Sequence, residues 1–337
     1  MTLSHEAWED RVRRAVLAAL EAPAADDDAE LHRFAELQRD YPQRGGKAIR
    51  ARLVLLSAEA HGAEVEQAVP AAAALELFQN WVLVHDDVED DSETRRGRPA
   101  LHRLVGAPLA INVGDAMHVA MWRLLIGIQA PWRDEVLNEF VVTIARTACG
   151  QHLDLAWVSS GRFDVDEDSY LAMVERKTAY YTVVAPLRLG ALVAGVAPDP
   201  RFEPAGLALG AAFQIRDDVL NLLPDATGAY GKELAGDLFE GKRTLLLGHA
   251  VAHMPERDAL RLRELLFRPR DEKSHEEMHE ALELIRRSGA IERVQAVAER
   301  KARDGLTLLR EALSAAKSAA AAEAIVELVE TLARRRA

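Results

Sequence analysis

Cysteine is nearly absent from this 337-residue chain, in which Cys149 is the only one. A single cysteine excludes an intramolecular disulfide, and we expect it to be a small buried apolar residue in a reducing compartment. The N-terminus also lacks the basic region followed by an apolar stretch that marks a signal peptide. These absences predict a cytoplasmic protein.

The chain has no excess of positive charge, since 42 Lys and Arg stand against 54 Asp and Glu, a net charge of −12. A nucleic-acid-binding protein would normally show a basic footprint, so this class is not expected. An anionic substrate remains compatible, because local basic groups and bound metal can reverse the field. No uncharged apolar stretch reaches about 18 residues, so we expect no membrane span.

Runs of β-branched residues are scarce, whereas alanine and leucine recur with helical periodicity. No long linker, repeat or low-complexity tail is present, so we predict one all-α domain over residues 1–337, with many helices packed around a central cavity. Asp166 or Asp168, and Ser318, are expected to cap helices. The expected helices cover residues 6–20, 28–37, 47–61, 69–90, 108–129, 133–156, 166–176, 180–195, 204–222, 243–252, 256–266, 275–288, 290–310 and 318–335.

Two aspartate clusters dominate the sequence, DDVEDD at residues 86–91 and DDVLN at residues 217–221. On a helix, positions one, three and four apart can share a face. The first cluster should therefore point Asp86, Asp87 and Asp90 roughly the same way. The second should do the same for Gln214, Asp217, Asp218 and Asn221.

A row of carboxylates repels itself unless a cation lies on it. An acidic run on a helix is more often a solvated face. Here, however, both clusters follow apolar segments, residues 75–84 and 207–215, which favours the mouth of a cleft. Two such rows facing each other would hold hard divalent ions and leave room for substrate phosphates.

Basic residues accompany these clusters at several breaks in the helical pattern. Gly45-Gly46-Lys47-Ala48-Ile49-Arg50 is a glycine-rich turn at a helix start, a reasonable anion site. It is not a Walker A loop, and none exists in the chain. Each basic position alone is more typical of a surface charge, so the argument depends on their joint pattern. The other positions are Arg95, Arg96, Lys177, Lys232, Lys242 and Arg243.

With these features together, the sequence resembles the trans-isoprenyl diphosphate synthase family, also called the polyprenyl synthetases. The segments that carry the resemblance are GGKAIR (45–50), QNWVLVHDDVEDDSETRRGRPALH (79–102), NVGDAM (112–117), KTA (177–179), FQIRDDVLN (213–221), GKELAGDL (231–238) and EGKRT (240–244). The resemblance implies the isoprenoid synthase fold and a homodimer. It also implies Mg²⁺-dependent head-to-tail condensation of isopentenyl diphosphate with an allylic diphosphate, by ionisation, condensation and elimination.

The resemblance further implies roles for individual residues, with three Mg²⁺ ions in each active site. Asp86 and Asp90 would bind metal with support from Asp87, and Asp217 would bind another ion with Asp218 acting through water. The groups holding isopentenyl diphosphate would be Lys47, Arg50, Gln79 and Arg96. Those holding the allylic diphosphate would be Arg95, Lys177, Lys232 and Lys242. Thr178 and Gln214 would lie near the reacting carbon, and Asp237 would orient the lysines.

Product length is predicted from the fifth and fourth residues before the first cluster, Trp81 and Val82. A large aromatic followed by a smaller residue resembles enzymes that stop at geranylgeranyl diphosphate, C20. A helical wheel places Val82 nearer the carboxylate face, and Phe78 is another candidate floor, so a farnesyl (C15) product is the alternative. The second cluster ends in Asn221 where the family usually has Asp, and neither Asn221 nor Asp91 receives a role.

Three other functions are each compatible with part of the sequence. His85-Asp86 is compatible with an HD-type metal phosphohydrolase, but no further histidines are suitably spaced. A class I terpene cyclase would share the first cluster but lack the site with Lys47 and Arg50. A non-catalytic partner subunit of a prenyl synthase would be expected to lose a cluster or the basic residues, which are all retained here.

Overall fold

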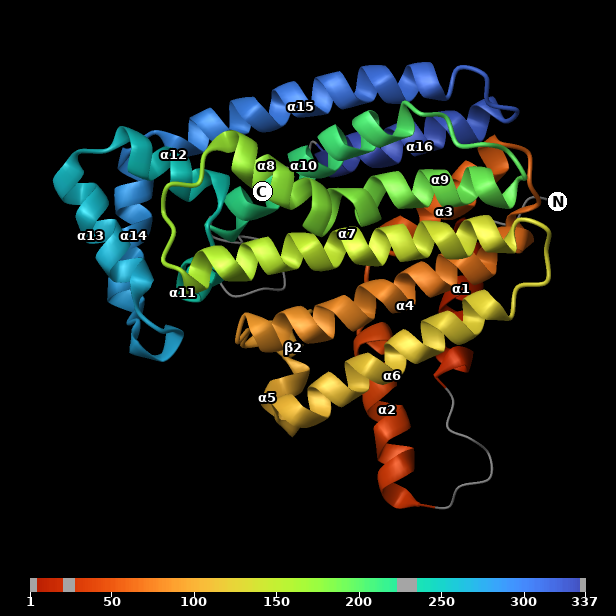
Figure 1. The fold of residues 1–337 in the computed structure, drawn as a ribbon, viewed down its shortest axis with the longest axis horizontal. Coiled ribbons are helices and arrows are strands. Elements are labelled where there is room, and N and C mark those ends of the chain that lie inside the picture. The colour runs from red at the N-terminus through yellow and green to blue at the C-terminus, as the bar shows by residue number, and fades with distance from the viewer. Residues whose placement is uncertain (1–4, 21–27, 223–234, 334–337) are drawn as a thin grey trace. The chain divides into compact units, whose positions relative to one another are not determined.

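The computed structural model describes residues 5–20, 28–222 and 235–333. The all-α class is confirmed, because the strands in those ranges form one short antiparallel hairpin, Thr94–Arg95 (β1) with Arg98–Pro99 (β2) (Figure 1). The chain divides into two compact units, each assembled from separate segments. Unit 1 comprises Met1–Val142, Ala185–Pro200 and Ala312–Ile325, and unit 2 comprises Thr143–Val184, Arg201–Glu311 and Val326–Ala337. The single domain predicted over residues 1–337 stays a prediction.

Unit 1 is organised around its longest helix, α4. Its helices are α1 (His5–Ala19), α2 (Ala29–Gln43), α3 (Ile49–Ala60), α4 (Val65–Glu89), α5 (Leu101–Val105), α6 (Ala107–Ile126) and α9 (Ala185–Val193). Helices α1, α3 and α6 all pack on α4, and Figure 1 shows α4 and α6 side by side. The segment of α4 from Ala71 to Ala74 is fully buried, and such small side chains let neighbouring helices approach closely.

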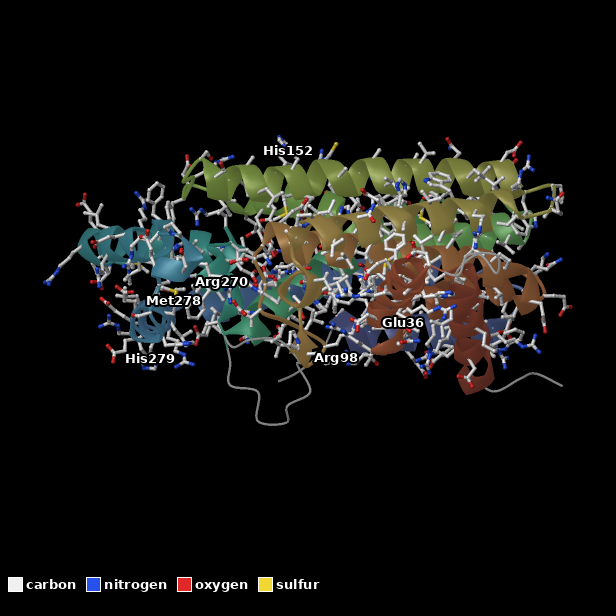
Figure 2. The ribbon with its side chains drawn as sticks, turned by 90° about the horizontal axis from the view of Figure 1, so that it is seen from below. Glu36, Arg98, His152, Arg270, Met278 and His279 are labelled. Carbon is white, nitrogen blue, oxygen red and sulfur yellow. The ribbon has the colours of Figure 1, made fainter. Side chains whose placement is uncertain are left out.

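Unit 2 packs shorter helices around an aliphatic core. Its elements are α8 (Glu167–Val174), the π-helix η1 (Glu175–Val184), α10 (Phe202–Asn221), α11 (Gly236–Glu240), α12 (Leu245–His253), α13 (Glu256–Phe267), the 3₁₀ turn η2 (Arg270–Glu272), α14 (His275–Arg287) and α15 (Ala290–Ala312). Helices α7 (Arg133–Ser159) and α16 (Ala319–Ala333) contribute to both units. In α14, Met278 is buried in the core and the adjacent His279 is exposed, as expected of an amphipathic helix (Figure 2).

The largest departure from the predicted helices is at residues 175–184. We expected a break between helices 166–176 and 180–195, but the chain continues there as a ten-residue π-helix. Three glycines of neighbouring helices lie against its backbone. A Cβ at Gly150 would stand 2.2 Å from the Lys177 nitrogen, one at Gly210 2.4 Å from the Ala179 Cα, and one at Gly206 2.6 Å from a Val184 methyl.

Several smaller features differ from the sequence-based expectations. Cys149 is exposed on α7, so the prediction that it is buried is wrong; its neighbour Ala148 is also exposed, and this face of the helix points outward. The caps at Asp166 and Ser318 are confirmed, with their side chains accepting from the backbone N–H groups of Ser169 at 2.8 Å and Ala321 at 3.2 Å. The elements that were not predicted are the hairpin, α5, η2 and α11.

Among the described helices, α6 alone is long and apolar enough to cross a membrane by length and composition, whereas the sequence predicted no span. It carries Asp115 and Arg123 and packs one face on α4. A long helix that contributes to a protein core passes the same length and composition test.

The glycine packing predicts that a methyl group at position 150 destabilises the protein. Gly150→Ala should lower the free energy of unfolding by about 1–3 kcal/mol, because the added carbon overpacks against the π-helix backbone. Gly127→Ala is the matched control, since Gly127 ends α6 with ordinary right-handed helical angles; it should be neutral or stabilising by up to about 1 kcal/mol. Chemical denaturation of both variants measures the difference. Equal stabilities would show that the π-helix is not tightly enclosed.

Candidate functional site

In unit 1, the first aspartate cluster forms the last turn of α4. Asp90 ends the helix, and its backbone N–H donates to the carbonyl of Asp86 at 2.8 Å. Both side chains are half-buried and lie one turn apart on the same side of the helix. The structure therefore brings together the two carboxylates predicted to be the principal metal ligands in this unit.

Asp87 is turned away from this pair and is fully buried. Its carboxylate accepts from the Tyr41 hydroxyl, from Arg95 Nε at 3.0 Å, and from Arg95 Nη2. The same Tyr41 oxygen accepts from the backbone N–H of Leu101 at 3.0 Å. Burial, followed by the charge of Asp87, raises the pKa of Tyr41 well above its usual 10. Asp87 thus ties the end of α4 to α2 and the hairpin.

The glycine-rich turn before α3 adopts an unusual backbone path. Gly45, Gly46 and Ala48 all have positive φ, at 81°, 159° and 44°. A Cβ on Gly46 would meet Arg96 Nη2 at 3.3 Å, so the Arg96 guanidinium lies directly beside the turn that carries Lys47. Arg96 Nη1 also donates to the Tyr41 carbonyl at 2.6 Å. Two of the residues predicted to bind isopentenyl diphosphate therefore lie in one place.

A half-buried glutamate on α4, Glu76, lies beside this basic group. Burial raises the pKa of Glu76, while the nearby charges of Arg50 and Arg96 lower it. Burial lowers the pKa of Arg96, Glu76 raises it, and the guanidinium groups of Arg95, Arg50 and Arg44 lower it further. Such a concentration of positive charge fits a bound anion. Gln79, one turn after Glu76, is half-buried on the same helix.

Asp91, to which the sequence gave no role, is a structural residue. It has a positive φ of 53° in the turn that follows α4. Its carboxylate pairs with Arg103 at 2.8 Å, and Arg103 also donates to its carbonyl at 2.8 Å. Asp91 therefore connects the end of α4 to α5.

In unit 2, the second cluster ends α10. Asp218 is buried and accepts from the Tyr170 hydroxyl at 2.6 Å and from Gln214 Nε2 at 2.8 Å. Burial, and then the charge of Asp237, raise the pKa of Asp218 to about 7; the two hydrogen bonds oppose this shift and the charge of Asp217 adds to it. Three carboxyl groups, those of Asp217, Asp218 and Asp237, thus act on one another here, and such a group suits a bound cation.

Asn221, the departure from the family pattern, has a structural explanation. It is buried, its Oδ1 accepts from the Asp237 backbone N–H at 3.1 Å, and its carbonyl accepts from Ala235 at 2.8 Å. These bonds fasten the start of α11 to the end of α10. Asp237 in turn lies 3.7 Å from Lys242, which also pairs with Glu240 at 2.7 Å; the role of Asp237 in orienting the lysines stays a prediction.

Lys177 and Thr178 are both on the π-helix. Lys177 Nζ donates to the buried carboxylate of Asp154 on α7 at 2.5 Å, and Thr178 is buried. Four residues of the site carry no signal in the sequence: Asp154, Glu76, Tyr41 and Tyr170. Nothing local identifies them, because their partners are many residues away in the chain. Lys232, predicted to hold the allylic diphosphate, lies outside the described residues.

The carboxylates of the two clusters are the candidate donors for the predicted Mg²⁺. Among the described residues, no group of three or more His, Cys, Asp or Glu side chains is arranged to enclose a metal ion. Mg²⁺ normally uses one or two protein carboxylates and completes its octahedron with water and substrate phosphate oxygens. The Asp86–Asp90 pair, and Asp218 with the neighbouring Asp217 and Asp237, fit that mode of binding.

The raised pKa of Asp218 predicts how the free energy of unfolding changes with pH when a chelator keeps the protein free of metal. Between the ordinary pKa of 3.8 and about pH 7, the folded protein keeps this carboxyl protonated while the unfolded chain ionises it. The free energy of unfolding therefore falls as pH rises over this range and levels off above about pH 7. Asp218→Asn removes this ionisation, so its stability relative to wild type should increase from pH 5 to pH 8.5 by on the order of a few kcal/mol. Denaturation at both pH values measures it. Any cost of the lost hydrogen bond is the same at both pH values. A difference in stability between variant and wild type that is equal at both pH values would contradict the shifted pKa.

Comparisons with known proteins agree with the site. A family model described as polyprenyl synthetase matches residues 32–285. A short chain isoprenyl diphosphate synthase from Methanothermobacter thermautotrophicus is 38% identical over 273 residues, covering 79% of this chain and 82% of that one. A geranylfarnesyl diphosphate synthase from Aeropyrum pernix is 34% identical over 282 residues, covering 80% and 83%.

A solved structure extends the likeness to the whole fold. The geranylgeranyl pyrophosphate synthase from Corynebacterium glutamicum, complexed with isoprenyl diphosphate and magnesium, matches with a TM-score of 0.88 at 28% identity, covering 99% of this chain and 100% of that one. The HD-type phosphohydrolase and terpene cyclase readings are set aside by these matches. The chain belongs to the polyprenyl synthetase family and is a prenyltransferase with the all-α isoprenoid synthase fold.

Proposed function

We propose that this protein condenses isopentenyl diphosphate head-to-tail with an allylic diphosphate in a Mg²⁺-dependent reaction, and that its main product is geranylgeranyl diphosphate. The observation that carries the proposal is the last turn of α4. There the half-buried Asp86 and Asp90 lie one turn apart, in the same unit as the basic group formed by Lys47, Arg50 and Arg96. Arg95 Nη2, which pairs with Asp87, also lies 3.9 Å from Asp86. This arrangement pairs a cation site with a diphosphate site.

The chemistry that these groups suit is ionisation of the allylic substrate. Bound Mg²⁺ supplies positive charge to the departing diphosphate. Lys177 adds a fixed positive group, and Asp154 orients it through their 2.5 Å contact. Preorganised charge of this kind stabilises a developing polyanion most strongly where water is excluded. The double bond of isopentenyl diphosphate then attacks the allylic cation.

No protein base is needed to finish the reaction, because the departing diphosphate can accept the proton. His85 adjoins Asp86 but is engaged elsewhere. Its Nε2 lies 3.2 Å from the Ile111 carbonyl and 3.7 Å from Asp115. A packing role between α4 and α6 accounts for His85.

The C20 product rests on Trp81 and the fully buried Phe78, with the half-buried Val82 between Trp81 and the cluster. The names of relatives differ in product length, and include geranylgeranyl, geranylfarnesyl and farnesyl diphosphate synthases. A C15 product, and a non-catalytic partner subunit, are the alternatives. Three Mg²⁺ ions per site and a cytoplasmic location stay predictions.

A product assay tests the activity. Purified protein with Mg²⁺, isopentenyl diphosphate and, separately, C5, C10 and C15 allylic diphosphates should give mainly C20 diphosphate by mass spectrometry. A C15 or longer main product would keep the chemistry and contradict the length assignment. Binding of both substrates without condensation would favour the partner-subunit reading.

Charge-removing variants test the site. Asp86→Asn and Asp217→Asn should each lower kcat by roughly 100-fold or more, since each removes a group acting on the developing charge. Glu36→Gln is the control, because Glu36 is an exposed acid on α2 (Figure 2), and its kcat should match wild type. Near-normal turnover in Asp86→Asn would remove this carboxylate from the proposed machinery.

We also propose that the chain forms a homodimer through α6. Away from α4, this helix exposes Leu109, Ile111, Val119 and Ile126, with exposed fractions of 43–66%. These side chains extend from the first turn of α6 to its last, with the exposed polar residues Asn112, Asp115 and Arg123 among them. Exposed apolar side chains gathered on one helix are typical of a protein interface. A second copy of the chain is the simplest partner, since the same surface can pair with itself about a two-fold axis.

Val119→Arg should therefore convert the dimer to a monomer, measured by sedimentation equilibrium, because each interface would bury two unpaired charges. Leu260→Arg is the matched control: Leu260 is 58% exposed on α13, and the variant should keep the wild-type mass. An unchanged mass for Val119→Arg, or a monomeric wild type, would exclude α6 as the dimer contact.

A further inference from the structure

Three side chains of α4 form a line on the side that faces α6. Phe78, Trp81 and His85 are three and four residues apart, so they stack along one face of the helix. The Phe78 and Trp81 rings meet edge to face with centroids 5.7 Å apart, and Trp81 and His85 do the same at 6.0 Å. Trp81 is the middle member of this line.

Helix α6 approaches this line at Gly114 and His118. A Cβ on Gly114 would stand 2.3 Å from His85 Nε2 and 3.3 Å from Trp81 Cδ1, so no larger residue fits there without displacing these rings. One turn later, the His118 imidazole lies flat on the Trp81 indole, with centroids 4.0 Å apart and planes inclined by 12°. Trp81 is thereby held between its own helix and α6.

His118 is itself held in place by Trp122. The indole Nε1 of Trp122 donates to His118 Nε2 at 2.8 Å, which requires that this nitrogen carries no proton. Burial lowers the pKa of His118; Asp115 opposes this shift and His85 adds to it. The imidazole is therefore neutral near pH 7 and accepts this bond.

The Trp81 indole N–H is buried and has no hydrogen-bond partner among the described residues. No polar contact of the indole nitrogen therefore orients the ring. Its flat contact with His118 is the closest ring contact that it makes. Removing the imidazole would leave an open side next to Trp81.

We infer that His118, fixed by Trp122, is a specificity-determining residue that holds Trp81 across the path of the growing prenyl tail. The inference rests on the proposed function, in which Trp81 limits product length. Trp81 precedes Asp86 by five residues, roughly 7.5 Å along the helix axis. The Trp81 ring at that depth limits the length of the prenyl chain only if the side chain cannot rotate away, and the His118 imidazole blocks this rotation.

The test is the product distribution of three variants with C5, C10 and C15 primers. His118→Ala should raise the ratio of longer to wild-type product by about 2- to 12-fold, the range expected for losing one aromatic pair. His118→Phe keeps a flat ring against Trp81 and should restore the wild-type distribution. Trp122→Phe keeps an aromatic ring but removes the N–H donor. It should therefore raise the ratio of longer to wild-type product by a smaller factor than His118→Ala.

A double variant shows whether His118 acts through Trp81. Trp81→Ala should lengthen the product, and adding His118→Ala to it should change nothing further, because coupled residues are not additive. His61→Ala is the matched control, because His61 is a half-buried histidine just after the end of α3 in the same unit, and the variant should keep both rate and product length.

Condensation by His118→Ala with an unchanged product distribution would overturn the inference and leave the proposed function intact. If His118→Ala does not fold, Trp122→Phe decides alone, and an unchanged distribution there has the same meaning. Absence of condensation in the wild-type protein would instead refute the proposed function.

Discussion

The buried ion pair between Asp87 and Arg95, shared with the Tyr41 hydroxyl, is the contact on which unit 1 depends at its functional end. It joins three parts of the chain that are distant in sequence: the end of α4, the β1–β2 hairpin and the end of α2. A buried charge is tolerated only when it is paired and hydrogen-bonded, and removing one member of such a pair typically costs about 3–5 kcal/mol. The pair also positions the neighbouring Arg96 beside the glycine-rich turn.

The two aspartate clusters share one design. In each Asp-Asp pair the second residue is buried and accepts from a tyrosine hydroxyl, Asp87 from Tyr41 and Asp218 from Tyr170. The first residue, Asp86 or Asp217, is half-buried. Successive residues on a helix differ by about 100°, so the two carboxylates of each pair point in different directions, the second against a tyrosine and the first nearer the surface. Both aspartate pairs lie within the family match, and the proposed metal chemistry uses the first residue of each pair.

Sequence periodicity anticipated most of the helices, because amphipathic patterns such as that of α14 have one dominant physical cause, burial of one face. It failed at residues 175–184, where an expected break is a π-helix. Whether a helix widens there depends on Gly150, Gly206 and Gly210, which belong to other helices. The expected burial of Cys149 failed for a related reason, since the orientation of a helix in the fold decides which small residues face outward.

The sequence by itself determined the all-α class, the family and the residues that carry charge at the site, because spacing along a helix and residue chemistry are local properties. Tertiary structure decided how those residues are used. Asp87 and Asn221 became structural, and Asp154, Glu76 and Tyr170 joined the site, because their partners come from distant segments, 46 residues away for Asp87 and 48 for Tyr170. Packing in three dimensions brings such groups together, and no local pattern in the chain encodes that meeting.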